Sequence, residues 1–178
     1  MMNEVLKTIQ TRRSVKKFKN EPVPKELLQK IAEAGIAAPS GLNMQSPIVL
    51  VVTDRQVRDE LSLLNAADDP FHRQDPFYGA PAVLVVLAKK DVRTRVYDGA
   101  LVMENMLLAA HSLGLGACWI HRAKETFEKA QGRAILERLG ITEEYEGIGN
   151  CIVGYADCTP DEKPRKENRI YYLDGMGE

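Results

Sequence analysis

Apolar residues recur at helical spacing in five stretches of the chain. Asn3 can cap a helix, and after it Val5, Leu6 and Ile9 fall on one face of a short helix. Over 96–113 apolar residues occupy most of the helix circumference, which is typical of a central, buried helix. The predicted helices are therefore one behind Asn3, one between Pro24 and Pro39, a short one capped by Asp54, a long one over 96–113 and one over 126–139.

Four other stretches have the composition of strands. The runs IVLVVTD, which starts at Ile48, and AVLVVLA, over 82–88, are continuously apolar, as in strands covered on both faces. A short strand is expected over 117–120 and another over 148–156. Helices and strands alternate without repeated βαβ units, so the pattern predicts an α+β fold with a mixed sheet flanked by helices.

The chain is expected to form one domain over 1–178, with 157–178 as a C-terminal extension. This extension ends in the apolar patch Ile170–Leu173 after a charged linker. We expect such a patch to dock on another surface. If that surface belongs to a second copy of the chain, the protein is an obligate dimer.

Charge and composition exclude several classes of protein. The 178 residues include 24 Lys and Arg against 25 Asp and Glu, so the net charge of −1 argues against a nucleic-acid or membrane-surface binder. We find no apolar run near the ~20 residues that span a bilayer and no secretory signal. Three cysteines without a C-x-x-C pair favour the cytoplasm, and the few histidines make a metal site unexpected.

The motifs of several enzyme classes are missing. The sequence has no G-x-S-x-G elbow, no P-loop and no H-E-x-x-H pair. The stretch GLGACW from Gly114 lacks the third glycine of a dinucleotide-binding loop and follows a helix instead of a strand. It is better explained as a helix stop.

Two short pairs of residues, each with at least one cation, could bind one phosphate. Arg12 and Ser14 are two residues apart in an extended segment, so a guanidinium and a hydroxyl point to the same side. Lys163 and Arg165 flank a proline that keeps their segment extended. The alternative is that both pairs are solvated surface charges.

Two further segments offer polar groups to a flat ligand. Ser40, Asn43 and Gln45 provide donors and acceptors in a compact loop, which suits the edge of a heterocycle or only a helix-to-strand turn. At the end of the strand 117–120, backbone N–H groups near His121 could approach a ring. Trp119 suits a core position at least as well as a stacking role, and Cys118 is expected to be an apolar filler because no base stands beside it.

In this order and spacing, the motifs resemble those of the nitroreductase family of FMN-dependent oxidoreductases. The landmarks are RRSVKKF from Arg12, AAPSGLNMQSP from Ala37, GLGACWI from Gly114 and the final K-x-R pair. The resemblance implies an α+β fold with a mixed or antiparallel central sheet flanked by helices. It also implies an intertwined homodimer with two FMN molecules at the interface.

The resemblance also implies which residues bind FMN. They are Arg12, Arg13 and Ser14 near the phosphate; Pro39, Ser40, Asn43 and Gln45, reaching over from the partner subunit; Ile120, His121 and Arg122, with their backbone at the flavin ring; and Lys163 and Arg165, closing on the phosphate. The chain departs from the family where Ser46, Pro47 and Ile48 replace an expected aromatic residue, and 68–79 has no recognisable counterpart.

The implied activity is reduction of a small nitroaromatic or quinone-like acceptor. NAD(P)H would act as a transient electron donor to FMN in a ping-pong reaction through flavin N5, with no catalytic side chain and no metal. A specialised flavin enzyme of the same fold, such as a reductive dehalogenase or a flavin-consuming enzyme, is an alternative. A non-catalytic flavin carrier and a helical interaction module without cofactor are two others.

Overall fold

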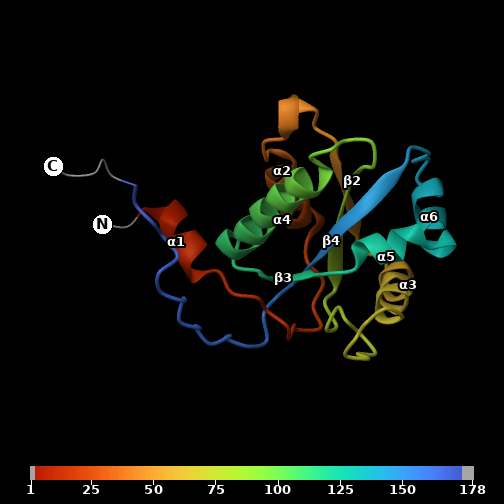
Figure 1. Cartoon of the computed structure of the whole chain (residues 1–178). Helices are drawn as coiled ribbons and strands as arrows, with labels where there is room; N and C mark the ends of the chain where they lie inside the picture. The colour runs from red at the N-terminus through yellow and green to blue at the C-terminus, as the bar shows by residue number, and fades with distance from the viewer. Residues whose placement is uncertain (1–2, 174–178) are drawn as a thin grey trace.

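A four-stranded antiparallel sheet forms the centre of the molecule in the computed structural model, which describes residues 3–173 (Figure 1). The strand order is β1-β2-β4-β3. The strands are β1 (Pro47–Val52), β2 (Ala82–Lys89), β3 (Gly116–Ile120) and β4 (Tyr145–Gly154). A single parallel bridge joins Ser14 to Ala117 of β3. The predicted α+β class, with a sheet flanked by helices, is confirmed.

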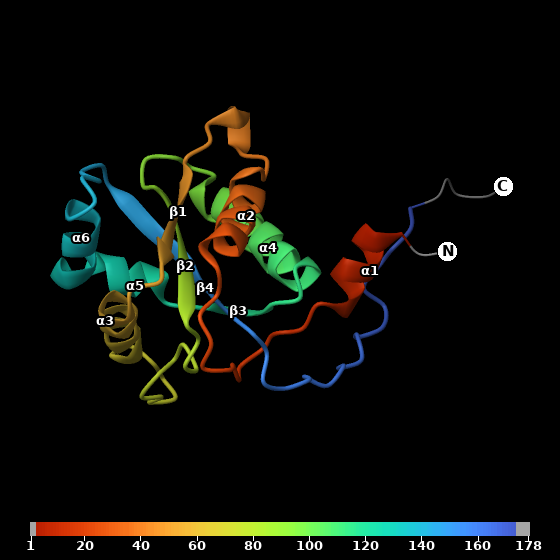
Figure 2. The same ribbon diagram turned by 180° about the vertical axis from the view of Figure 1, so that it is seen from behind.

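Helices cover both faces of this sheet (Figures 1 and 2). On one face lie α2 (Lys25–Ile36) and the long central helix α4 (Arg95–Ser112). On the other lie α3 (Arg55–Ala66), α5 (Ala123–Glu128) and α6 (Ala130–Glu137). Because successive strand residues point to opposite faces, Leu84 and Val86 of β2 pack towards α4, and Val83 and Val85 pack towards α5. None of the helices that the structure describes is long and apolar enough to cross a bilayer.

Helix caps fall where the sequence predicts them. The Asn3 side chain accepts a hydrogen bond from the Leu6 N–H at the start of α1 (Glu4–Thr11). The Asp54 side chain accepts one from the Val57 N–H at the start of α3. These local contacts fix where each helix begins.

Two elements differ from the prediction. The helix expected over 126–139 is divided into α5 and α6 by Lys129, whose backbone is extended with φ −76° and ψ 151°. The Lys129 ammonium group donates to the Leu64 carbonyl and pairs with Asp68, so contacts with the end of α3 hold the break.

Strand β1 is a half-exposed edge strand within one chain, although its apolar run predicted cover on both faces.

Helix α1 and the C-terminal segment lie together at one end of the molecule, away from the sheet (Figures 1 and 2). Residues before α2 run beside residues after β4, with backbone hydrogen bonds from Lys19 to Tyr155 and from Asp157 to Lys17. No residue of α1 is buried. At least three quarters of the surface of each residue of the predicted patch Ile170–Leu173 is exposed, and the rest of the extension, 174–178, lies outside the described residues.

Candidate functional site

The predicted phosphate-binding segment runs along the edge strand β3. Ser14 forms a bridge with Ala117, and the Val15 N–H donates to the Ala117 carbonyl. Arg12 lies nearby with its Nε atom 3.6 Å from Glu104 Oε1. This Nε is buried and has no hydrogen-bond partner within the described residues. Arg12 therefore retains a donor that an anion could satisfy.

Arg13, next to Arg12 in the sequence, contacts the C-terminal segment. The Arg13 guanidinium is 2.8 Å from the Glu162 carboxylate and also donates to the backbone carbonyls of Gln10 and Arg12. Lys163 and Arg165 follow directly and are exposed. The two cationic segments, far apart in sequence, are therefore neighbours in one chain, although Arg13 itself is already paired. A cavity of about 480 Å³ lies beside Arg12 and Arg13, with His111 and Glu162 also in its wall, but Lys163 and Arg165 do not line it.

The predicted loop Pro39–Gln45 forms a short 3-10 turn, η1 (Gly41–Asn43), with an unusual backbone. Leu42, Asn43 and Gln45 have positive φ angles of 52°, 55° and 48°. The Gln45 N–H donates to Ser40 Oγ at 2.9 Å, and Gln45 Nε2 donates to Asn43 Oδ1 at 3.0 Å. The three predicted polar side chains are thus one hydrogen-bonded cluster.

Helix α4 holds this loop in place. The buried Asp98 carboxylate accepts hydrogen bonds from the Gly41 N–H at 3.0 Å and from the Thr94 hydroxyl at 2.8 Å. A Cβ on Gly41 would lie 2.6 Å from Thr94 Oγ1, so only glycine allows this close approach.

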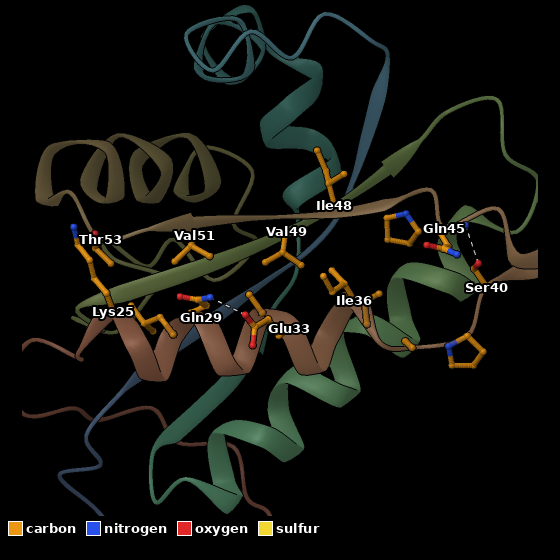
Figure 3. Close-up of a pocket in the computed structure, with 16 residues that line it drawn as sticks. Lys25, Gln29, Glu33, Ile36, Ser40, Gln45, Ile48, Val49, Val51 and Thr53 are labelled. Atoms are coloured by element: carbon orange, nitrogen blue, oxygen red, sulfur yellow. Dashed lines mark hydrogen bonds between the residues drawn. The ribbon is translucent and has the colours of Figure 1, made fainter.

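The loop borders a groove between α2 and β1 (Figure 3). The groove has a volume of about 780 Å³. Ile36 and Val49 face each other across it, Lys25 and Glu33 lie along its rim, and Ser40 and Gln45 close one end. Of residues 3–173, none lines both this groove and the cavity beside Arg12. The loop and the cationic segments are therefore not brought together within one chain.

The predicted ring-contacting turn follows β3. Ile120 is buried, His121 is exposed, and Arg122 is 9% exposed with a left-handed backbone at φ 71° and ψ 20°. The Arg122 guanidinium donates to the Asn65 backbone carbonyl at 3.3 Å and to Asn65 Oδ1 at 3.0 Å. It also lies 3.3 Å from the Asp69 carboxylate. The Arg122 side chain thus points into the protein, beside the exposed residue His121.

Two titratable side chains near these segments have shifted pKa values. Burial raises the pKa of the Cys118 thiol, so the thiolate is disfavoured, as expected for an apolar filler. Burial, with Arg12 and Arg13 nearby, lowers the pKa of His111, whose Nε2 lies 2.8 Å from the Thr11 hydroxyl.

Four polar residues around the site were not predicted from the sequence: Asn65, Asp69, Asp98 and Asn150. All four are buried. Asn150 gave a visible signal, because a polar residue in the apolar strand sequence IGNCIVG needs a special partner. Its amide donates towards the carbonyls of Ile120 and His121, each at 3.4 Å. Asp98 gave a similar signal, because it is a charged residue in the mostly apolar predicted helix 96–113. Asn65 and Asp69 gave none, because they lie where the predicted short helix passes into a polar loop.

Fold and site together define an α+β protein with cationic segments at one edge of its sheet and a polar loop at a separate groove. A sequence model of the nitroreductase family matches residues 9–155, most of the chain. The chain belongs to the nitroreductase family.

Solved structures with similar folds cover nearly the whole chain. A nitroreductase with bound FMN from Bacteroides fragilis has 30% sequence identity and a TM-score of 0.86, covering 97% of this chain and 100% of its own. A nitroreductase with bound FMN from Desulfitobacterium hafniense has 31% identity and a TM-score of 0.88, covering 98% and 100%. An NADPH-flavin oxidoreductase from Vibrio harveyi is 29% identical over 174 residues, which is 92% of this chain and 70% of the relative. The match covers 60% of the length of a relative from Methanothermobacter thermautotrophicus. It covers 92% of the length of a relative from Archaeoglobus fulgidus.

Proposed function

We propose that this protein is an FMN-dependent NAD(P)H oxidoreductase that reduces small nitroaromatic or quinone-like acceptors. The similarity to two FMN-bound nitroreductases over nearly the whole chain carries this proposal. The relative named as an NADPH-flavin oxidoreductase supports the nicotinamide donor. The three cysteines are unpaired, two of them buried, which supports a reducing compartment such as the cytoplasm.

The residues present fit the phosphate of FMN. Among the described residues, the buried Nε of Arg12 has no partner, and a phosphate oxygen would satisfy it with a charge-assisted hydrogen bond. Ser14 lies two residues on in the same extended segment, and Lys163 and Arg165 follow the Glu162 that pairs with Arg13. We assign the phosphate to these four side chains, with Arg13 orienting the C-terminal segment through Glu162.

The remaining contacts require a second copy of the chain. Pro39, Ser40, Asn43 and Gln45 belong to the groove side of the molecule and share no cavity with Arg12. We assign them to the flavin bound mainly by the partner subunit, and we assign the backbone of Ile120, His121 and Arg122 to the flavin ring of their own subunit. In this arrangement the chain is one domain over 1–178 whose extension 157–178 docks on the partner.

FMN, when bound, supplies the redox chemistry, because it takes a hydride from NAD(P)H and passes electrons to an acceptor. The chain contributes binding, orientation and a surface that donor and acceptor occupy in turn. No side chain has to act as an acid or base. We therefore expect ping-pong kinetics, in which the oxidised nicotinamide leaves before the acceptor binds.

A bleaching experiment tests the proposal. Purified protein is loaded with FMN, and the visible absorbance of the oxidised flavin is followed after NADH or NADPH is added without oxygen. We expect bleaching, and return of the colour when a quinone or a nitroaromatic compound is added. A protein that stays yellow would be a flavin carrier, and one that stays colourless after incubation with FMN would bind no flavin.

Steady-state kinetics test the order of events. Initial rates at several fixed acceptor concentrations should give parallel double-reciprocal lines, the pattern of a ping-pong reaction. Intersecting lines would show that donor and acceptor bind together, and would refute this part of the proposal.

A further inference from the structure

The turn after β3 contains a buried arginine where glycine is the easiest residue to accommodate. Arg122 has φ 71°, a conformation that is uncommon for residues with a side chain. Such backbone outliers persist only where surrounding contacts hold them, and they concentrate at functional sites. The contacts of Arg122 therefore point to what this turn does.

Asn65 of α3 holds both halves of the turn. Its Oδ1 atom accepts a hydrogen bond from the Arg122 guanidinium at 3.0 Å, and its Nδ2 atom donates to the His121 carbonyl oxygen at 2.8 Å. Asn150 of β4 donates to the same carbonyl at 3.4 Å. The His121 carbonyl is thus fixed towards the protein interior by two buried amides.

The direction of this carbonyl fixes the direction of the next N–H group. A trans peptide bond is planar, so the His121 carbonyl and the Arg122 N–H point in opposite directions. The N–H must therefore point away from Asn65 and Asn150. Among the turns, loops and caps of residues 3–173, no backbone carbonyl accepts a hydrogen bond from it.

We propose that Arg122, Asn65 and Asp69 form a positioning set that aims the Arg122 backbone N–H at the flavin ring. This inference rests on the proposed function, which places the ring against Ile120, His121 and Arg122. An N–H donor held in this direction stabilises the negative charge that reduction places on the ring. The set thereby raises the reduction potential of the bound flavin without contacting it through a side chain.

The fold does not need Arg122 to neutralise Asp69. Both oxygens of that buried carboxylate are already bound by Arg73, through Nε at 2.6 Å and Nη2 at 2.7 Å. Arg73 also donates to the Tyr78 hydroxyl at 2.8 Å, so we expect the loop 69–78 to keep its contacts when Arg122 is replaced. The Arg122 guanidinium can therefore hold the turn through Asn65. Asp69, 3.3 Å away, fixes the orientation of the guanidinium.

The sharpest test replaces the amide that holds the His121 carbonyl. Asn65→Asp keeps the shape of the side chain and an acceptor for Arg122, but puts an acceptor against the carbonyl in place of a donor. Arg122→Lys keeps the charge and loses the planar fork of donors. The matched control is Arg58→Lys, since Arg58 is also buried, and it binds Asp75 and the Ala80 carbonyl, away from the turn.

Three quantities are measured on FMN-loaded protein: the midpoint potential of the flavin, kcat with NADH, and the Kd of FMN. We expect Asn65→Asp and Arg122→Lys to lower the potential and to reduce kcat about 5- to 10-fold, the effect of one lost hydrogen bond. FMN affinity should change less than about 3-fold, because the phosphate contacts are unchanged. Arg58→Lys should lower only the melting temperature.

An unchanged potential and kcat in both variants would overturn the inference, as would an equal change in the Arg58→Lys control. If either variant is unstable, Arg122→Gly replaces it, because glycine adopts the left-handed turn without strain and Asp69 keeps Arg73. Loss of folding in all three variants, with the control folded, would assign these residues to stability alone. Parent protein that binds FMN but is not bleached by NADH or NADPH would instead refute the proposed function.

Discussion

At the scale of single residues, arginine has two separate roles in this chain. Arg58 and Arg122 are buried, and each is bound by a carboxylate and by a backbone carbonyl. Arg12 is the opposite case, because its Nε is buried without a hydrogen-bond partner among the described residues. A buried cation that a carboxylate and a backbone carbonyl already bind contributes to the architecture, and one with a spare donor is suited to bind an anion.

The spare donor of Arg12 makes a direct prediction. Arg12→Ala and Arg165→Ala should each weaken FMN binding about 10- to 100-fold, since a charge-assisted hydrogen bond is worth about 1.5–3 kcal/mol. Titration of protein with FMN, followed by quenching of flavin fluorescence, measures the Kd. Lys90→Ala is the control, because Lys90 pairs with Glu144 at the surface, away from both cationic segments. Unchanged affinity in both arginine variants would mean that the phosphate lies elsewhere.

His111 predicts a pH dependence of stability. Burial, assisted by Arg12 and Arg13, lowers its pKa in the folded protein, so the unfolded chain binds the proton more readily. The stabilisation is fully present above the unfolded pKa of about 6.5 and is lost as the pH falls below it. The melting temperature should therefore drop more between about pH 7.5 and about pH 5.5 in the parent than in His111→Gln. An equal drop in both proteins would contradict this account.

At the scale of secondary-structure elements, close approach decides the packing of α5 on the sheet. Gly147 lies in β4 next to the register shift between Val86 and Leu87 of β2. A Cβ at this position would lie 2.3 Å from the backbone carbonyl carbon and oxygen of Ala123. Helix α5 can therefore reach β4 only because residue 147 has no side chain.

Gly147→Ala should consequently destabilise the fold through overlap with backbone atoms. We expect a loss of about 2–3 kcal/mol in the free energy of unfolding, measured by urea denaturation. Gly114→Ala is the matched comparison, because Gly114 has φ +77° but no atom within 4 Å of an added Cβ. That variant should lose only about 1 kcal/mol, the cost of a left-handed backbone. Similar losses in the two variants would show that α5 can move away from β4.

The sequence predicted those features of helices and strands that depend on neighbouring residues in the chain. Asn3 and Asp54 cap helices as expected, because a cap depends on residues only a few positions away. The break at Lys129 was missed because it depends on contacts with Leu64 and Asp68 of a distant segment. For the same reason the polar set around Asn65 could not be predicted, although the end of the neighbouring strand at Ile120 was.

At the scale of the whole molecule, one chain leaves several apolar surfaces exposed. Val5, Leu6 and Ile9 of α1 are about half exposed or more, and Leu42 at the tip of the loop Pro39–Gln45 is 96% exposed. The groove between α2 and β1 is another such surface. Exposed apolar surface on this scale favours association with a second molecule. Association of two chains would also explain why the loop Pro39–Gln45 lies apart from the cationic segments. Each site would then be completed by the loop of one chain and the cationic segments of the other.

The C-terminal segment gives the clearest test of this association. Ile170, Tyr171, Tyr172 and Leu173 expose most of their surface in one chain, so we expect them to be buried against the partner. Deleting residues from Ile170 onward should therefore raise the dimer dissociation constant at least about 10-fold, because several large apolar side chains would lose their cover. Analytical ultracentrifugation over a dilution series measures this constant. The control deletion starts at Asp174 and keeps the four apolar residues. If the longer deletion leaves the protein as dimeric as the control does, the C-terminal segment does not hold the dimer together. In that case the exposed faces of α1 and of the α2–β1 groove must account for any association.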